Sequence, residues 1–166
     1  INSMSTYLSS ALRTYIERGG AVFFTAGAEM NLNDYNSYLI PQTGLPAIEG
    51  YRDPEASFFS LDIPDIKHPL FTNVFSDAFK GVNSVEIYRM YKFSPADDWK
   101  VIIGASGDPF LMEKELGKGR IFLMASGFEK TCSNITENGF AVPLIMNSIS
   151  YLSGSETSGS LYYEVG

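Results

Sequence analysis

Two stretches of the chain, one near each end, repeat apolar residues at helical spacing. Near the start, a spacing of three and four residues predicts an amphipathic helix, built on Met4, Leu8, Ala11, Leu12, Tyr15 and Ile16. Ser3 or Ser5 is placed to cap this helix, and Gly19-Gly20 ends it. Near the other end, the same spacing predicts a helix built on Phe140, Leu144, Ile145, Ile149 and Leu152. Pro143 suits its first turn, where a missing N–H costs nothing.

Continuous apolar runs between these helices predict buried strands. The run 21–25, AVFFT, and the run 100–106, KVIIGAS, are typical of strands covered on both faces, as in a parallel sheet. The runs 109–116 and 120–126 flank a short Gly-Lys-Gly turn, which predicts a tight hairpin.

Other segments alternate or carry turn residues. Residues 57–63 and 84–93 alternate apolar and polar positions, which predicts half-exposed strands. Short helices are expected around 35–39 and at 72–81, each followed by Pro or Gly. The Pro- and Gly-containing stretch 45–57 is expected to be a loop.

This order of elements predicts an α/β fold. We expect a three-layer sandwich, with helices on both faces of a mixed, mainly parallel sheet and a hairpin added on one side. Residues 1–153 form one predicted domain, and 154–166 form a linker and the start of a following segment. A helix that leads into a central parallel strand implies an earlier strand, so we expect the domain to lack its first strand.

Composition and charge limit the classes of partner that the chain can bind. The chain has 166 residues, of which 45% are apolar, enough for one globular core. Its formal net charge of −7 disfavours nucleic acids and anionic membrane surfaces. No apolar run reaches the roughly 20 residues of a membrane span, so membrane contact is expected only through flanking segments.

Cys132 and His68 are the sole cysteine and histidine, and so the candidates for a nucleophile and its base. Cys132 follows an apolar strand, but it lacks the flanking glycines of a nucleophile elbow. The residues favour a packed thiol and a structural or solvated imidazole. A catalytic dyad would require the two loops to meet within roughly 4 Å or across one water.

The sequence also bears on metal, cofactor and binding sites. One histidine and one cysteine predict no metal site, and no cofactor motif is present. The carboxylates in DIPD and ADD are expected to be solvated: Asp62, Asp65, Asp97 and Asp98. The stretch GASGDP follows a strand end, where α/β ligands bind, so Ser106 and Asp108 are candidate binding residues. Tyr88 and Tyr91 join them because Tyr on half-exposed elements is typical of interaction surfaces.

An ordered set of motifs carries a family resemblance: the Gly-Gly before AVFFTAG, the HPLF turn, the GKGR hairpin, and FAVPL opening the last helix. The set resembles the class I glutamine amidotransferase-like domain of membrane-anchored, BatA-type (aerotolerance-related) bacterial proteins, particularly of Bacteroidetes. The resemblance implies a flavodoxin-like sandwich in the extracytoplasmic (periplasmic) part of an inner-membrane protein. True amidotransferases carry a Cys in a nucleophile elbow and a late His-x-Glu. This chain has neither, so the family's catalytic roles fall on none of its residues.

Three functional hypotheses follow. The first is a non-catalytic interaction or scaffolding domain of a larger membrane-anchored cell-envelope protein, with protein partners bound through Tyr-rich faces. The second is a degenerate amidotransferase- or hydrolase-like enzyme that uses Cys132 and His68. The third is a small sugar- or peptide-binding pocket near GASGDP.

Overall fold

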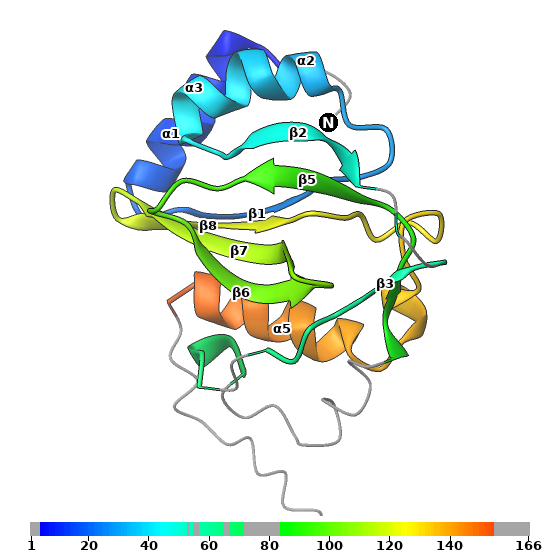
Figure 1. The fold of residues 1–166 in the computed structure, drawn as a ribbon. Helices are drawn as coiled ribbons and strands as arrows, with labels where there is room; N and C mark the ends of the chain where they lie inside the picture. Colours follow the sequence, from blue (N-terminus) through cyan, green and yellow to red (C-terminus); the bar gives the residue numbers. More distant parts are fainter. Residues whose placement is uncertain (1–3, 53, 55–56, 65–66, 72–83, 155–166) are drawn as a thin grey trace, which may run out of the picture.

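The computed structural model describes most of the chain (Figure 1). The described ranges are 4–52, 54, 57–64, 67–71 and 84–154. The predicted helix at 72–81 and nearly all of the predicted linker lie outside them, so neither prediction is tested.

Along the described chain, the first strand lies among the first helices, and the other strands come between the third and the last of the described α-helices. The helices are α1 (Thr6–Glu17), α2 (Leu32–Asp34), α3 (Ile40–Thr43) and α5 (Ala141–Leu152), with a π-helical turn η1 (Tyr35–Leu39) and 3-10 turns η2 (Pro69–Phe71) and η4 (Ile135–Glu137). The strands are β1 (Ala21–Thr25), β2 (Ala47–Arg52), β3 (Phe59–Ser60), β4 (Glu86–Ile87), β5 (Met90–Ser94), β6 (Lys100–Ala105), β7 (Asp108–Leu116) and β8 (Gly119–Met124). The predicted α/β class is confirmed.

Four strands form the main sheet, in the order β1-β8-β7-β6. β1 runs parallel to β8, with Ala21 opposite Arg120 and Thr25 opposite Met124. β8, β7 and β6 pair antiparallel, and the β7–β8 hairpin forms at the predicted Gly-Lys-Gly turn. The sheet is mixed, as predicted, but it is not mainly parallel: among the described strands only the β1–β8 pair is parallel, because β6, β7 and β8 follow one another through tight hairpins.

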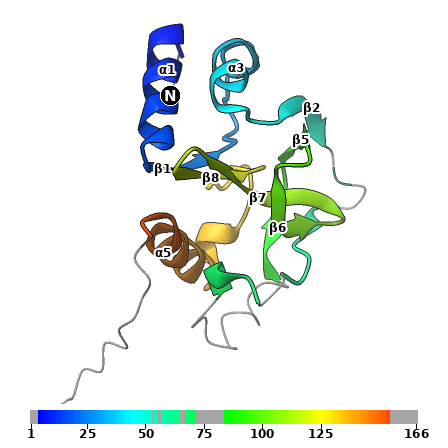
Figure 2. The same ribbon diagram turned by 90° about the vertical axis from the view of Figure 1, so that its left-hand side faces the viewer.

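Local signals explain the two long helices. The Ser5 side chain accepts a hydrogen bond from the backbone N–H of Leu8 at 3.3 Å and caps α1, as predicted. Gly19 takes a left-handed backbone conformation (φ 106°) where the chain leaves this helix. Figure 2 shows α1 and α5 on opposite sides of the main sheet. The central strand β8 is therefore covered on both faces, and Ile121 and Phe122 are fully buried.

Two predictions need correction. The predicted loop at 45–57 contains β2, which pairs antiparallel with β5. Gly50 lies at a bulge in that pair with φ 147°, so a turn-forming residue interrupts a ladder instead of marking a loop. The predicted strand at 84–93 is divided into β4 and β5, which pair with β3 and β2 respectively.

The first apolar run, AVFFT, has one open edge among the described strands. It forms β1 and runs parallel to its neighbour, as predicted. However, β1 lies at the edge of the sheet among the described strands, and its apolar residues from Ala21 to Phe24 are only half-buried. A strand with the composition of a central strand therefore has one unpaired edge.

Candidate functional site

Cys132 lies in the loop that follows β8, and the protein buries it. The residue is 1% exposed, and its backbone N–H donates to the carbonyl oxygen of Glu129 at 2.7 Å. Burial raises the pKa of the Cys132 thiol above its ordinary value, and the nearby Glu129 carboxylate adds to this rise. These surroundings favour the neutral thiol, which is the poorer nucleophile.

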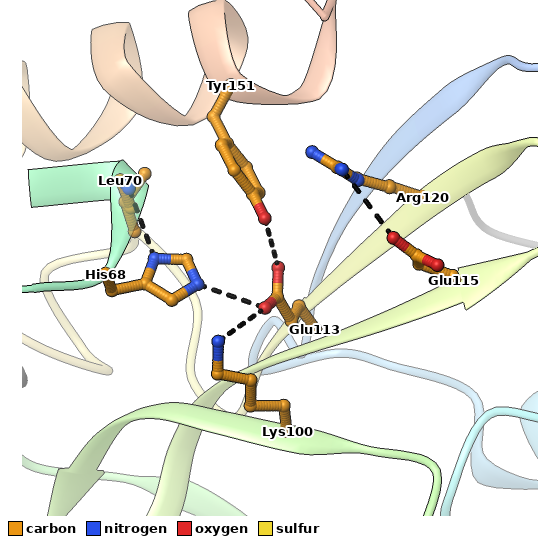
Figure 3. Close-up of polar contacts among 7 residues, drawn as sticks. All are labelled: His68, Leu70, Lys100, Glu113, Glu115, Arg120 and Tyr151. Atoms are coloured by element: carbon orange, nitrogen blue, oxygen red, sulfur yellow. Dashed lines mark hydrogen bonds and ion pairs between the residues drawn. The ribbon is translucent and has the colours of Figure 1, made fainter. Parts of the chain in front are cut away.

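His68 is also buried, at 4% exposed, and both ring nitrogens have partners (Figure 3). Nδ1 accepts a hydrogen bond from the backbone N–H of Leu70 at 3.1 Å, so this nitrogen carries no proton. Nε2 lies 3.0 Å from Oε1 of Glu113 and donates to it. The geometry therefore selects the neutral Nε2–H tautomer and leaves no free nitrogen to accept a proton from a nucleophile.

The structure does not bring Cys132 and His68 together as a hydrogen-bonded dyad. His68 contacts η2, β7 and α5, whereas Cys132 contacts the loop after β8 and the backbone of Tyr88 and Arg89. Within the described residues, no hydrogen bond joins the thiol to the imidazole.

Glu113 of β7 is the centre of a polar cluster that no sequence motif indicated. Its carboxylate accepts hydrogen bonds from His68 and, at 3.0 Å, from the Tyr151 hydroxyl of α5, and it forms an ion pair with Lys100 of β6 at 3.3 Å (Figure 3). Burial alone would raise the pKa of Glu113. The hydrogen bonds from His68 and Tyr151 and the charge of Lys100 outweigh burial and lower this pKa below its ordinary value.

Arg120 extends this cluster toward solvent. Its guanidinium lies over the Tyr151 ring, 4.5 Å from the centroid, and 3.6 Å from the carboxylate of Glu115. A small open hollow of ≈ 260 Å³ lies beside these residues and the β7–β8 turn. Both oxygens of the Glu113 carboxylate have partners, so the cluster links β6, β7, η2 and α5.

A second group of aromatic residues closes the end of β1. The hydroxyls of Tyr51 and Tyr91 lie 2.6 Å apart, and their rings are 4.4 Å apart. Tyr91 donates to the carbonyl oxygen of Gly27, and Tyr51 to that of Ala28, both at 3.3 Å. Arg89 lies over the Tyr51 ring at 5.3 Å. These contacts fill the carboxyl end of the parallel β1–β8 pair, which is the usual ligand position in such sheets.

The four predicted binding residues do not form one pocket. Tyr91 is buried at 1% exposure in the group just described, whereas Tyr88 is half-exposed and donates to Glu86 at 2.7 Å. Ser106 lies in the β6–β7 turn with φ 48°, and Asp108 is the first residue of β7. Asp108 Oδ2 lies 2.7 Å from Arg52 Nε, but it accepts no well-aligned hydrogen bond from the described residues.

The clearest exposed apolar surface flanks the open edge of β1. We call it the β1 face, and it comprises three elements: the stripe Leu8, Ala11 and Tyr15 on α1, the edge residues Ala21 and Phe23, and the stripe Val142, Met146 and Ile149 on α5. The α1 stripe has the spacing i, i+3, i+7 and the α5 stripe the spacing i, i+4, i+7, so each lies along one side of its helix. On both helices the stripe lies next to the residues that pack on the core. Val142, Met146 and Ile149 are 68%, 58% and 57% exposed, and Tyr15 is 55% exposed.

Two hollows follow the β1 face. One, of ≈ 390 Å³, is lined by residues of all three elements, among them Tyr15, Phe23 and Ile149. The other, of ≈ 420 Å³, lies along α1 and shares Tyr15 and Gly20 with the first. The β1 face is therefore hollowed between its two apolar helices. Among the described residues, no group of three or more His, Cys, Asp or Glu is placed to bind a metal ion.

Comparison with known proteins supports the fold. No family model and no curated protein matches the chain. Two cytoplasmic proteins of Salmonella typhimurium are similar in structure, with TM-scores of 0.68 and 0.66 at 16% and 11% identity; each match covers 87% of this chain and 60% of the other. A ThuA-like protein of Bacteroides uniformis matches with a TM-score of 0.62 at 14% identity, covering 96% of this chain and 69% of the other.

These matches confirm part of the predicted resemblance and correct another part. ThuA-like proteins have a class I glutamine amidotransferase-like fold, and the mixed α/β structure of this chain is compatible with it. The chain spans about 60% of the length of the two Salmonella proteins. Both Salmonella proteins are called cytoplasmic, and this contradicts the predicted periplasmic location of a membrane-anchored domain, which rested on the family resemblance. Within the described part, no helix combines the length and the apolar character that crossing a bilayer requires.

Proposed function

We propose that this chain is a non-catalytic protein-interaction domain and that it binds through the β1 face. The observation that carries the proposal is the exposure of two apolar helical stripes on either side of an unpaired strand edge. Scattered exposed apolar residues are normal on protein surfaces, but a contiguous hollowed patch of them marks interaction sites. Tyr15 supplies the large amphipathic contact that is enriched in interfaces.

The contacts of the other candidate residues support this choice over an enzyme. The thiol of Cys132 is buried and its pKa is raised, and both nitrogens of His68 are engaged. The carboxyl end of the β1–β8 pair is filled by the Tyr51–Tyr91 group. The structure thus gives more support to a binding surface than to a reaction site or a small-molecule pocket.

We also propose that the domain is a three-layer sandwich. Helices on the two sides of the sheet support the predicted three-layer, flavodoxin-like sandwich. The specific likeness to BatA-type domains rests on the sequence motifs and stays a prediction. The predicted interaction through tyrosines is modified, because the exposed Tyr15 on the β1 face now takes the place of Tyr91, which is buried.

Site-specific photo-crosslinking in cells that produce the protein tests this function. A photoreactive amino acid is placed at Tyr15 or Ile149 on the β1 face, or at Ile63 as a matched control. Ile63 is 82% exposed, in a stretch outside both helices and β1. We expect protein adducts from Tyr15 and Ile149 and few from Ile63. Equal adducts from all three positions, or none from the β1 face, would refute the proposal.

A further inference from the structure

The backbone of β1 shows which groups its open edge presents. Gly20 accepts from the N–H of Arg120, and the N–H of Ala26 donates to Met124, so alternate residues of β1 face β8. Val22 and Phe24 therefore face β8, whereas Ala21, Phe23 and Thr25 direct their backbone groups to the open edge. Of these outward groups, the Thr25 carbonyl already accepts from Gly27 at 3.2 Å.

We infer that the occupant of the β1 face is a second copy of this chain, which pairs antiparallel with β1 about a two-fold axis at Phe23. The inference rests on the proposed function and names its partner. The two-fold axis places Phe23 opposite Phe23 of the second copy, and Ala21 opposite Thr25. Each of these residues directs its backbone N–H and C=O outward, so two opposite residues can exchange two hydrogen bonds. This is the arrangement of a hydrogen-bonded pair in an antiparallel ladder.

The helices beside β1 fit the same symmetry. A two-fold axis normal to the sheet keeps α1 of both copies on one side and α5 of both copies on the other. Each exposed apolar stripe then meets its own equivalent, Leu8 and Tyr15 on one side and Met146 and Ile149 on the other. An interface of this isologous kind needs no second type of surface.

The distribution of charge allows a second copy to dock at this face. The chain has a formal net charge of −7, so two copies repel each other over most approaches. Neither β1 nor α5 contains a charged residue, and the stripe of α1 is likewise uncharged. The apolar residues that meet about the two-fold axis are therefore uncharged, and the exposed Arg18, which lines the hollow along α1, is the charged residue beside them.

The mass of the chain in solution, measured by light scattering and sedimentation over about 1–200 µM, tests the inference. We expect the dimer mass to fall to the monomer mass on dilution. Tyr15→Glu and Ile149→Glu, each at an exposed helix position, should shift the dissociation constant upward by at least tenfold, whereas Ile63→Glu, which adds the same charge elsewhere, should not. Circular dichroism and the fluorescence of buried Trp99 check that each variant is folded.

Hydrogen exchange gives a residue-level readout of the pairing. In the dimer, the amides of Ala21 and Phe23 should become protected, while those of Val22 and Phe24 should be protected in monomer and dimer alike. A monomer at all concentrations overturns the inference, as does a dimer that is unchanged in Tyr15→Glu and Ile149→Glu. If the photo-crosslinks from the β1 face contain only a different protein, the proposed function stands and the second copy is excluded; if no adduct forms, both fail.

Discussion

Replacement of Glu113 is expected to destabilise the protein, by a larger amount when its hydrogen bonds are lost and by a smaller amount when only its charge is lost. In Glu113→Ala, His68 and Tyr151 both lose their acceptor. A hydrogen bond to a charged group contributes roughly 1.5–3 kcal/mol, so losing two should lower the free energy of unfolding by about 4 kcal/mol. Lys100 adds little because its side chain is 63% exposed and the ion pair is screened by solvent.

Glu113→Gln separates the charge from the hydrogen bonds. The amide oxygen can accept from His68, and the amide nitrogen can donate to a Tyr151 hydroxyl that has reversed its role. The shape and both hydrogen bonds then survive while the charge is lost, so we expect a loss of roughly 1–2 kcal/mol. Glu115→Gln, two residues along β7 and 77% exposed, is the matched control and should change stability by less than about 0.5 kcal/mol.

The pH dependence of this difference tests its electrostatic origin. The folded-state pKa of Glu113 is lowered below its ordinary value of 4.5. A carboxyl with a lowered pKa stabilises the fold above the unfolded-state pKa, and this stabilisation is lost as pH falls through the folded-state pKa. Urea unfolding followed by Trp99 fluorescence should therefore show the gap between wild type and Glu113→Gln constant near neutral pH and closing below pH 4.5. A gap that is independent of pH would refute the reasoning.

Three further predictions concern single residues. Cys132 should react slowly with a thiol reagent at pH 8 and rapidly only on unfolding, because burial excludes the reagent and raises the pKa of the thiol; fast reaction of the folded protein would contradict the structure. Gly119→Ala should cost at least about 2 kcal/mol in urea unfolding, because its methyl would overlap the backbone of Ile16 and Gly20, whereas Gly139→Ala should be neutral because its methyl meets open space. Ser106→Asn should raise the thermal midpoint through a gain of roughly 0.5–1 kcal/mol, because Ser106 has φ 48° in a two-residue hairpin turn; an unchanged midpoint would show no strain there.

The long helices and the hairpin could be predicted because their signals are local. Ser5, Gly19 and Pro143 act within one turn of the chain, and the structure uses each as expected. β2 could not be predicted because Gly50, which usually marks a loop, lies at a bulge that only the pairing with β5 explains.

The Glu113 cluster was missed for a different reason. His68 was singled out as a possible base, but its partner Glu113 is 45 residues away in the sequence, and Tyr151 is another 38 residues beyond Glu113. Glu113 follows three buried apolar residues of β7 and is followed by Lys114, which binds Asp98 on another part of the surface. Nothing in that local pattern shows which face a carboxylate takes or which donors meet it.

The conflict over β1 is the most informative of these differences. The apolar run Ala21–Thr25 predicts a strand covered on both faces, whereas its apolar residues are only half-buried and it has one neighbour, β8, among the described strands. An edge strand of this kind, without a charge or a proline, is open to pairing with another chain, which proteins usually prevent. The helices α1 and α5 also expose apolar residues beside this edge, among them Tyr15 and Ile149. The open edge of β1 and the apolar stripes of α1 and α5 border one surface. A single partner strand paired with β1 would therefore bring a partner that covers all three.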